Sequence, residues 1–430
     1  MDSAPSLKNK DIHRYNPFYA ITIWLIASAY IFYKYFIEVA PNVMNQDLMR
    51  FFHASGTSLG ILGGAYFLAY MVMQVPLGMM LDHWGPRIVI TVFIFLCAVG
   101  TLIFALSPVI SIAILARALT GAGAAVGAIG CLKIITMLFP TRYFSLMIGS
   151  MMAIGMLGAM TGQAPLNYAI THFEGWQNVL FLTGILGLIL AVLFWLATIP
   201  MNRYVILQKT IKQRISWSSL SIILKEPKNW YLAIYSGLVF SPIMVLGGLW
   251  GVTFIETVHH LSRQSASNAI TFIFVGFVIG APLFGWLSEV QGKRLPILRI
   301  GTAIAFVILA VMIYGHSLGT IILSILCFLL GFFVSSFLLS FSLIREMNLI
   351  VFAGTTLGFM NMFNGLTGAI AEPMIGFILE HHWTGTMAED IRVFSIKGYQ
   401  HALSVLPIVV LIALILTFTF KETFCQQREH

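Results

Sequence analysis

The sequence predicts an all-α membrane protein in which twelve transmembrane helices form two pseudo-symmetric six-helix bundles. Composition is the first reason, because 59% of the 430 residues are hydrophobic and only 9% are charged, unlike a typical soluble domain. The mean hydropathy is +0.90. The second reason is that the apolar residues form runs of the roughly 20 residues that a bilayer requires. The third is a short charged turn that occurs twice, about 200 residues apart.

The apolar runs divide the chain into three parts. Six fall within residues 1–199, which we expect to form an N-terminal bundle, and six within residues 229–430, which we expect to form a C-terminal one. Residues 200–228 carry six bases and one acid and predict a cytoplasmic linker, which could hold an amphipathic helix along the headgroups. The predicted spans are 17–40, 57–81, 88–106, 110–137, 145–171, 177–199, 229–257, 265–288, 296–315, 318–343, 350–379 and 401–420.

The repeated turn joins the second and third predicted spans of each half. In both copies an acid follows a glycine by four positions, a second glycine follows the acid by three, and a base follows the acid by five. Small glycines allow two helices to approach, and an acid and a base beside a turn can fasten a helix end to its neighbour. The residues are Gly78, Asp82, Gly85 and Arg87 in the first copy, and Gly285, Glu289, Gly292 and Arg294 in the second.

The distribution of basic residues predicts the orientation. With the N-terminus inside, seventeen of the 24 Lys and Arg fall in cytoplasmic segments and four in external ones, as the positive-inside rule expects. Both termini are therefore predicted to be cytoplasmic. Ala27-Ser28-Ala29 resembles a signal-peptidase site, but the apolar run continues to about residue 40, so we expect an uncleaved first helix. The absence of an N-x-S/T sequon favours a bacterial inner membrane.

The two turns resemble the loop signature between helices 2 and 3, and again 8 and 9, of the major facilitator superfamily. His83, Pro86 and Glu289 stand where that family usually has Arg, Arg and Asp. The resemblance implies two parallel bundles related by an axis along the membrane normal, which rock around a central site, with the turns as latches on the cytoplasmic side. The layout of helices 1 and 2 and the Gly-rich helix 11 also resemble the phagosomal nutrient transporters of intracellular bacteria and, more remotely, lysosomal dipeptide transporters.

Ionisable residues inside spans are costly and indicate functional sites. Lys34 and Glu38 stand one turn apart on one face of the first span, and Tyr30 continues this face. They could line a cavity, with Glu38 carrying a proton and Lys34 holding its charge or meeting a substrate carboxylate. Alternatively, both lie near the external end of the helix and reach water.

The fourth span contains two bases. Arg117 begins the sequence R-A-L-T-G-A-G, which resembles the helix-4 motif of the superfamily. In that family the arginine is linked to proton coupling or substrate binding, and the alternative is a buried pairing that only joins helices. Lys133 lies sixteen residues further, about 160° around the helix, and is expected to reach the cytoplasmic surface.

Glu372 precedes a proline in the glycine-rich eleventh span. A carboxyl group there could bind and release a proton as a cavity opens and closes. The alternative is a lone acid satisfied by the backbone groups that the proline frees. Uncharged residues that could contact a substrate, although asparagines also join membrane helices, are Gln163, Asn361 and Asn364, with Tyr70, Gln74 and Trp250 as weaker candidates.

Several functions lack support in the sequence. The formal charge of +8 does not indicate nucleic acid, because the bases do not cluster on a soluble face. No H-E-x-x-H, G-x-x-x-x-G-K-[ST] or G-x-S-x-G motif occurs, so we predict no enzyme, metal site or cofactor. The cysteines are widely spaced and are expected to be packing residues; they are Cys97, Cys131, Cys327 and Cys425.

We therefore expect a secondary active transporter that moves a small polar organic solute, such as an amino acid, a peptide, a nucleoside or an organic anion, by proton-coupled uptake. The expected partners are this solute, protons and the lipid bilayer, and we expect a monomer. Helix 5 lacks the Gly-Pro-x-x-Gly-Gly element usual in drug antiporters, which disfavours the alternative of a proton-coupled exporter of drugs, siderophores or metabolites. An alternative of another class is a non-transporting solute sensor.

Overall fold

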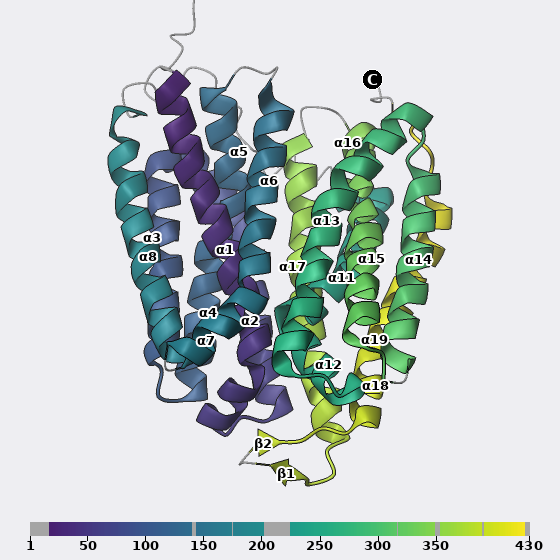
Figure 1. The fold of residues 1–430 in the computed structure, drawn as a ribbon. Coiled ribbons are helices and arrows are strands. Elements are labelled where there is room, and N and C mark those ends of the chain that lie inside the picture. Colours follow the sequence, from purple (N-terminus) through teal and green to yellow (C-terminus); the bar gives the residue numbers. More distant parts are fainter. Residues whose placement is uncertain are drawn as a thin grey trace, which may run out of the picture.

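A computed structural model describes residues 17–139, 143–173, 175–201, 224–315, 317–348, 353–388 and 391–425. Two bundles of helices stand side by side (Figure 1), one built by residues up to 201 and the other by residues from 224 onward. The first helix begins and the last one ends on the same side of the molecule, which we call the termini side. A small hairpin marks the opposite side, which we call the hairpin side.

The first bundle is entirely helical in its described residues. Its elements are α1 (Pro17–Phe52), α2 (Gly56–Trp84), α3 (Pro86–Leu106), α4 (Ile110–Ala124), α5 (Val126–Leu138), α6 (Phe144–Thr161), α7 (Ala164–His172), α8 (Trp176–Ala197) and η2 (Ile199–Met201).

The second bundle adds a two-stranded antiparallel hairpin in which Met387 faces Arg392. Its elements are α11 (Pro227–Gly248), α12 (Gly251–His259), α13 (Arg263–Gln291), α14 (Leu295–Tyr314), α15 (Thr320–Val334), η3 (Ser335–Leu338), α16 (Leu339–Met347), α17 (Ala353–His381), β1 (Met387–Ala388), β2 (Ile391–Arg392), α18 (Ile396–Leu403), α19 (Val405–Leu416) and η5 (Thr417–Thr419).

The predicted all-α membrane fold is confirmed. Among the described residues, eleven helices are long and apolar enough to cross a membrane, or twelve if the pair α6 and α7, bent by 44°, forms one span. The amphipathic helix expected in the linker falls mostly on residues 202–223, which lie outside the described part of the chain.

Helix α1 is longer than predicted. Hydropathy ends it near residue 40, but the helix passes Pro41 and continues to Phe52. The polar side chains of Asn42 and Asn45 are fully buried, because they meet the second bundle and not water. The prediction of a loop after residue 40 is therefore wrong, because the polar residues there contact the second bundle and do not mark the end of the helix.

The predicted span 229–257 is interrupted after about two thirds of its length. Helix α11 ends at Gly248 and α12 begins at Gly251. A Cβ atom on Gly251 would overlap the carbonyl oxygen of Leu246, so only glycine lets the chain fold back this closely. An interrupted helix leaves backbone groups without intrahelical partners, and in this protein side chains of the first bundle bind them.

The bundles meet along α2 and α17, which pack lengthwise against one another. A Cβ atom on Gly60 would lie 2.6 Å from the carbonyl oxygen of Glu372. A Cβ atom on Gly376 would overlap the backbone of Gly56. Small residues are what allow membrane helices to approach this closely. Because these contacts lie toward the hairpin end of both helices (Figure 1), the two bundles are closed together on the hairpin side.

Candidate functional site

Lys34 and Glu38 form an ion pair in the interior of the first bundle. Lys34 is 6% exposed and Glu38 is 9% exposed. The Lys34 ammonium lies 3.7 Å from the centre of the Tyr35 ring and 5.2 Å from that of Tyr70, a geometry that stabilises a cation. The Tyr66 hydroxyl donates a hydrogen bond of 3.0 Å to Glu38 Oε2. Neighbouring side chains of α1 and α2 therefore satisfy both charges.

The interpretation that this pair reaches water at the end of its helix is wrong. It rested on a first span that ends near residue 40, whereas α1 continues to Phe52. Fourteen residues of helix extend about 21 Å, so the pair lies deep within the bundle. Tyr30, one turn earlier, donates a 2.7 Å hydrogen bond to the carbonyl oxygen of Gly123 and so joins α1 to α4.

Arg117 holds α4 against α1 at the level of the ion pair. It is 1% exposed, and its guanidinium donates to the carbonyl oxygens of Ile37 at 3.0 Å and Glu38 at 3.4 Å. Its central carbon lies 4.7 Å from the centre of the Tyr66 ring. The arginine thus places a fixed positive charge beside the backbone of α1 at Ile37 and Glu38. Lys133, further along this span, is half-buried in α5.

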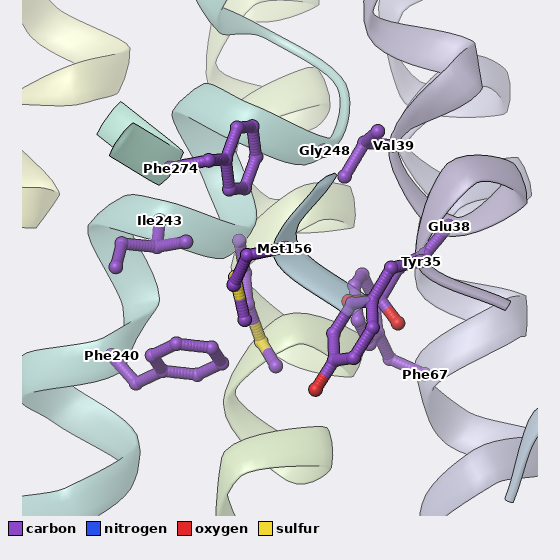
Figure 2. A pocket seen from close by; sticks show the side chains of 10 residues that line it. Tyr35, Glu38, Val39, Phe67, Met156, Phe240, Ile243, Gly248 and Phe274 are labelled. Carbon is purple, nitrogen blue, oxygen red and sulfur yellow. The ribbon is translucent and has the colours of Figure 1, made fainter. Parts of the chain in front are cut away.

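A small cavity separates the bundles beside the ion pair. Its water-sized space is about 20 Å³, which holds one or two water molecules. Figure 2 shows the Tyr35 hydroxyl and the Glu38 carboxylate on one side of it, with Phe240, Ile243 and Phe274 across from them. In this conformation the cavity is too small for an organic solute, so the bundles must separate to admit one.

Glu372 lies in a slot between the bundles, which we call the glycine slot because Gly63 of α2 and Gly248 of α11 form two of its walls. The residue is 1% exposed. A Cβ atom on Gly63 would overlap Glu372 Oε2, and one on Gly248 would lie 2.8 Å from Oε1. Oε2 has no hydrogen-bond partner among the described residues. The structure therefore encloses this carboxyl group without neutralising it.

Three amide side chains of the first bundle form hydrogen bonds with the backbone at the interruption between α11 and α12. They are Asn42, Asn45 and Gln163, and we call them the amide clamp. Asn42 Nδ2 donates to the carbonyl oxygen of Leu246 at 2.8 Å, and its Oδ1 accepts from the Val252 amide at 3.1 Å. Gln163 Nε2 donates to the Gly247 carbonyl oxygen at 2.8 Å. Asn45 Nδ2 donates to that of Leu249 at 2.8 Å.

Gln163, predicted as a substrate contact, belongs to this clamp in the present conformation, where it also accepts a 3.2 Å hydrogen bond from Asn42. Its contact with a substrate stays a prediction. Asn42 and Asn45 were not predicted from the sequence. The sequence does contain an indication that the helix continues through them, because amide residues recur after the apolar run of α1 and no glycine there ends the helix.

Of the other predicted polar residues, Gln74 is buried, and neither atom of its amide has a hydrogen-bond partner among the described residues, whereas the following residues have partners. Asn361 Nδ2 donates to the Tyr70 hydroxyl at 3.0 Å, which joins α17 to α2. Asn364 Oδ1 accepts a 2.8 Å hydrogen bond from Ser236 within the second bundle. Trp250, which is fully buried, donates from Nε1 to the Glu372 carbonyl oxygen at 3.3 Å. The aromatic ring of Trp250 thereby holds the interrupted helix against α17.

Ion pairs close the hairpin side. Arg263 of α13 pairs with Asp47 of α1 at 2.5 Å. Glu380, near the end of α17, accepts a 3.0 Å hydrogen bond from the Gly56 amide at the start of α2 and pairs with Arg392 of the hairpin. Asp47 and Glu380 therefore each link the two bundles, and Glu380 also holds the hairpin against α17. These contacts must break when the hairpin side opens.

The repeated turns lie on the termini side and differ from one another. Gly85 has φ 83° and Gly292 φ 62°, a region that favours glycine, so both glycines form turns as predicted. Arg87 is 8% exposed, and its guanidinium lies 3.9 Å from the centre of the Trp195 ring. The side chain of Asp82 lies outside the described part of the structure. Gly78 lies near the end of α2.

In the second turn Arg294 binds an acid that lies outside the turn. Arg294 pairs with Glu346 at 2.5 Å, while Glu289 is exposed at the end of α13. Gly285 has open space around it, so it does not mediate a close helix contact here. The reason is geometric, since α16 brings Glu346 to the buried face of the turn and Glu289 lies on the other face.

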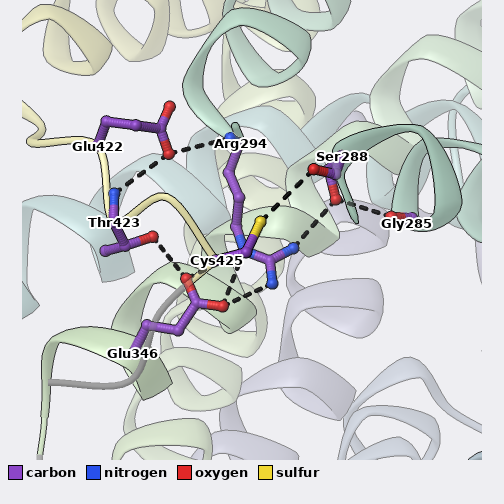
Figure 3. Close-up of polar contacts among 7 residues, drawn as sticks. All are labelled: Gly285, Ser288, Arg294, Glu346, Glu422, Thr423 and Cys425. Carbon is purple, nitrogen blue, oxygen red and sulfur yellow. Dashed lines mark hydrogen bonds and ion pairs between the residues drawn. The ribbon is translucent and has the colours of Figure 1, made fainter. Parts of the chain in front are cut away.

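The C-terminal segment completes this cluster (Figure 3). Glu422 accepts hydrogen bonds from the amides of Arg294 at 3.0 Å and Leu295 at 2.9 Å, and so caps the start of α14. Thr423 donates to Glu346 at 2.5 Å. Cys425 Sγ lies 3.5 Å from the Ser288 carbonyl oxygen, and desolvation raises the pKa of this thiol. Cys97, Cys131 and Cys327 are buried and free, as expected of packing residues.

Two helical bundles that enclose a buried charge site, and that are closed together on one side, define a multi-pass membrane transport protein. Comparisons with known proteins agree. The sequence model of the Major Facilitator Superfamily matches residues 22–372, and the chain belongs to this family. It is a secondary transporter of small molecules and not an enzyme.

Individual relatives are distant. The MFS-type transporter YdgK of Bacillus subtilis, itself uncharacterized, is 26% identical over 347 residues, covering 77% of this chain and 82% of that protein. The D-galactonate transporter of Escherichia coli O6:H1 is 22% identical over 372 residues, covering 79% and 84%. The crystal structure of a bacterial homologue of the human lysosomal transporter Spinster, inward-facing and occupied, matches with a TM-score of 0.76 at 17% identity, covering 94% and 97%.

Proposed function

We propose that the protein takes up a small carboxylate-bearing solute, an organic anion or a zwitterion such as an amino acid, together with a proton. The single observation that carries this proposal is the pair of buried acids with opposite surroundings. Glu38 is neutralised by Lys34 beside the cavity, whereas Glu372 is enclosed in the glycine slot with one oxygen unpartnered among the described residues.

Glu372 is the proton carrier in this proposal. An unpaired carboxylate in an apolar interior is costly, whereas the protonated acid is tolerated. Gly63 belongs to the first bundle and Glu372 to the second, so opening the hairpin side takes one wall of the slot away and admits water. In the open state the acid takes a proton from the external water, and the protonated acid is enclosed as this side closes. Gly248 also lines the central cavity, which gives the proton a route to the opposite side.

Lys34 is the group that binds the solute's carboxylate. Its ammonium pairs with Glu38, which lines the cavity, and Tyr35, Tyr66 and Tyr70 surround the pair with rings and hydroxyl groups. A carboxylate that enters competes with Glu38 for Lys34, and a zwitterion offers Glu38 an ammonium in exchange. Arg117 positions α1 at this level through the carbonyl oxygens of Ile37 and Glu38.

We place the termini side in the cytoplasm of a bacterial inner membrane, following the excess of bases there. The hairpin side then faces outward, and the structure corresponds to a state closed to the outside. In the D-galactonate transporter the named solute is itself a carboxylate, which supports the solute class without identifying the solute.

Uptake into proteoliposomes tests this proposal. Vesicles with an imposed pH gradient, acid outside, and the membrane potential clamped at zero by valinomycin and potassium should accumulate radiolabelled carboxylates from a panel of amino acids and organic acids. Collapsing the gradient should abolish accumulation but leave exchange of internal for external solute. Solute movement that is independent of the pH gradient would leave a uniporter, and outward movement of solute driven by the same gradient would favour the exporter.

A further inference from the structure

The central cavity has one wall with polar atoms and one without. On the side of the first bundle, the Tyr35 hydroxyl and the Glu38 carboxylate face it (Figure 2). From the second bundle it is lined by Phe240, Ile243, Met244, Gly248 and Phe274. Among the described lining residues, the second bundle therefore contributes no polar side chain.

The apolar wall is backed by further apolar layers. The Phe240 ring stacks on Phe337 at 5.0 Å, and Phe277 lies 6.2 Å from both rings. Phe274 and Met244 are 3% and 8% exposed, so packing fixes their positions. Small rotamer changes at this wall would bring other apolar atoms to the cavity and no hydrogen-bonding group.

The amides of the second bundle that could have supplied polar contacts are occupied. Asn364 accepts its hydrogen bond from Ser236, and Asn361 donates to Tyr70. Glu372 lies behind Gly248, enclosed in the glycine slot. A hydroxyl group placed against the apolar wall would lose its hydrogen bonds to water and find no replacement, which is a strong basis for rejecting it.

We infer that the transported carboxylate carries an apolar body, such as a branched aliphatic or aromatic group, and is not a polyhydroxylated acid. The carboxylate meets Lys34 on α1, and the apolar body lies against Phe240, Met244 and Phe274 across the cavity. This inference rests on the proposed function, because it concerns the other half of the same solute.

This inference is tested with four probes in which the carboxylate and the apolar body are varied independently. They are 3-phenylpropionate (acid, apolar body), D-galactonate (acid, polyol body), 3-phenylpropan-1-ol (no acid, apolar body) and D-galactitol (no acid, polyol body). Thermal unfolding of the purified protein is measured with each, since a ligand that binds the folded state raises its stability. We expect 3-phenylpropionate to bind at least about tenfold more tightly than each of the other three.

The contradicting outcomes are distinct. Equal or tighter binding of D-galactonate overturns the inference and leaves carboxylate recognition standing. Binding of 3-phenylpropan-1-ol as tight as that of the acid overturns the proposed carboxylate site and leaves the apolar wall standing. A panel in which none of the four probes binds overturns both.

A matched pair of variants examines the wall itself. Met244→Gln keeps the length of the side chain but places an amide at the cavity, whereas Met244→Leu keeps the wall apolar. We expect Met244→Gln to bind 3-phenylpropionate about tenfold more weakly than Met244→Leu does, and to show a smaller preference for 3-phenylpropionate over D-galactonate than Met244→Leu. Equal behaviour of both variants would overturn the role of this wall.

Discussion

The two bundles repeat one plan but divide the chemistry between them. The first places Lys34, Glu38 and Arg117 together on adjacent helices. The second contributes an apolar wall and one buried carboxyl group, Glu372. Although the helical arrangement is repeated, each of these polar groups is needed only once, because the candidate site lies between the bundles and side chains of both bundles line it. In the proposed mechanism, solute recognition and proton binding are thereby assigned to parts that move relative to one another.

Lys34→Met should have the largest effect on the first bundle. Removing the lysine leaves Glu38 buried with only the Tyr66 hydroxyl, and breaking a buried ion pair in this way costs about 3–5 kcal/mol. The double variant Lys34→Met/Glu38→Met should recover most of that stability, because no unpaired charge remains, but it should not bind a carboxylate. Thermal unfolding and ligand binding of both variants check this. Recovery of binding in the double variant would contradict the role of Lys34.

Glu372→Gln should have the next largest effect, confined to coupling. A glutamine fills the slot but exchanges no proton, so accumulation driven by a pH gradient should fall on the order of 100-fold, the size of effect expected when a proton-transfer group is lost. Solute exchange at equal pH should persist. Glu289→Gln, on an exposed acid of the same bundle, is the matched control and should accumulate normally. Gradient-driven accumulation by Glu372→Gln would contradict the assignment of Glu372 as the proton carrier.

Gly63→Ala should act through the fit between the bundles. The added methyl group would overlap Glu372 Oε2, so we expect the hairpin side to close less often and transport to fall about tenfold, which corresponds to about 1.4 kcal/mol. Spin labels on the hairpin-side ends of α2 and α17 should report longer distances. Gly285→Ala is the control, because its surroundings are open. Unchanged distances in Gly63→Ala would show that the slot tolerates the methyl group.

The smallest effect should separate the two acids of the second turn. Glu289 is exposed, so Glu289→Gln should change the free energy of unfolding by less than about 0.5 kcal/mol. Glu346→Gln removes the charge that pairs with buried Arg294 and should destabilise the protein more than Glu289→Gln does. Equal effects of the two substitutions would contradict the role of Glu346 as the acid that stabilises Arg294.

Much of this arrangement could be predicted from the sequence. The all-helical membrane fold followed from run length and composition, and the family from two turns at matching places. The deep position of Lys34 and Glu38 did not follow, because Pro41 and the amides after it imitate the end of a span. The partner of Arg294 was also missed, since Glu346 lies 52 residues further along the chain and no local spacing connects them. The amide clamp depends on backbone groups freed by an interrupted helix, which hydropathy cannot reveal.

The most direct test of the central claim is whether solute binding protonates Glu372. Purified protein in weakly buffered solution at pH 8, with pyranine as the indicator, is mixed with 3-phenylpropionate. If the ligand favours the closed state in which the glycine slot excludes water, the solution should become more alkaline by about one proton per bound ligand, and Glu372→Gln should bind the ligand without this change. Binding by the parent protein without proton uptake, or the same uptake by Glu372→Gln, would contradict the account.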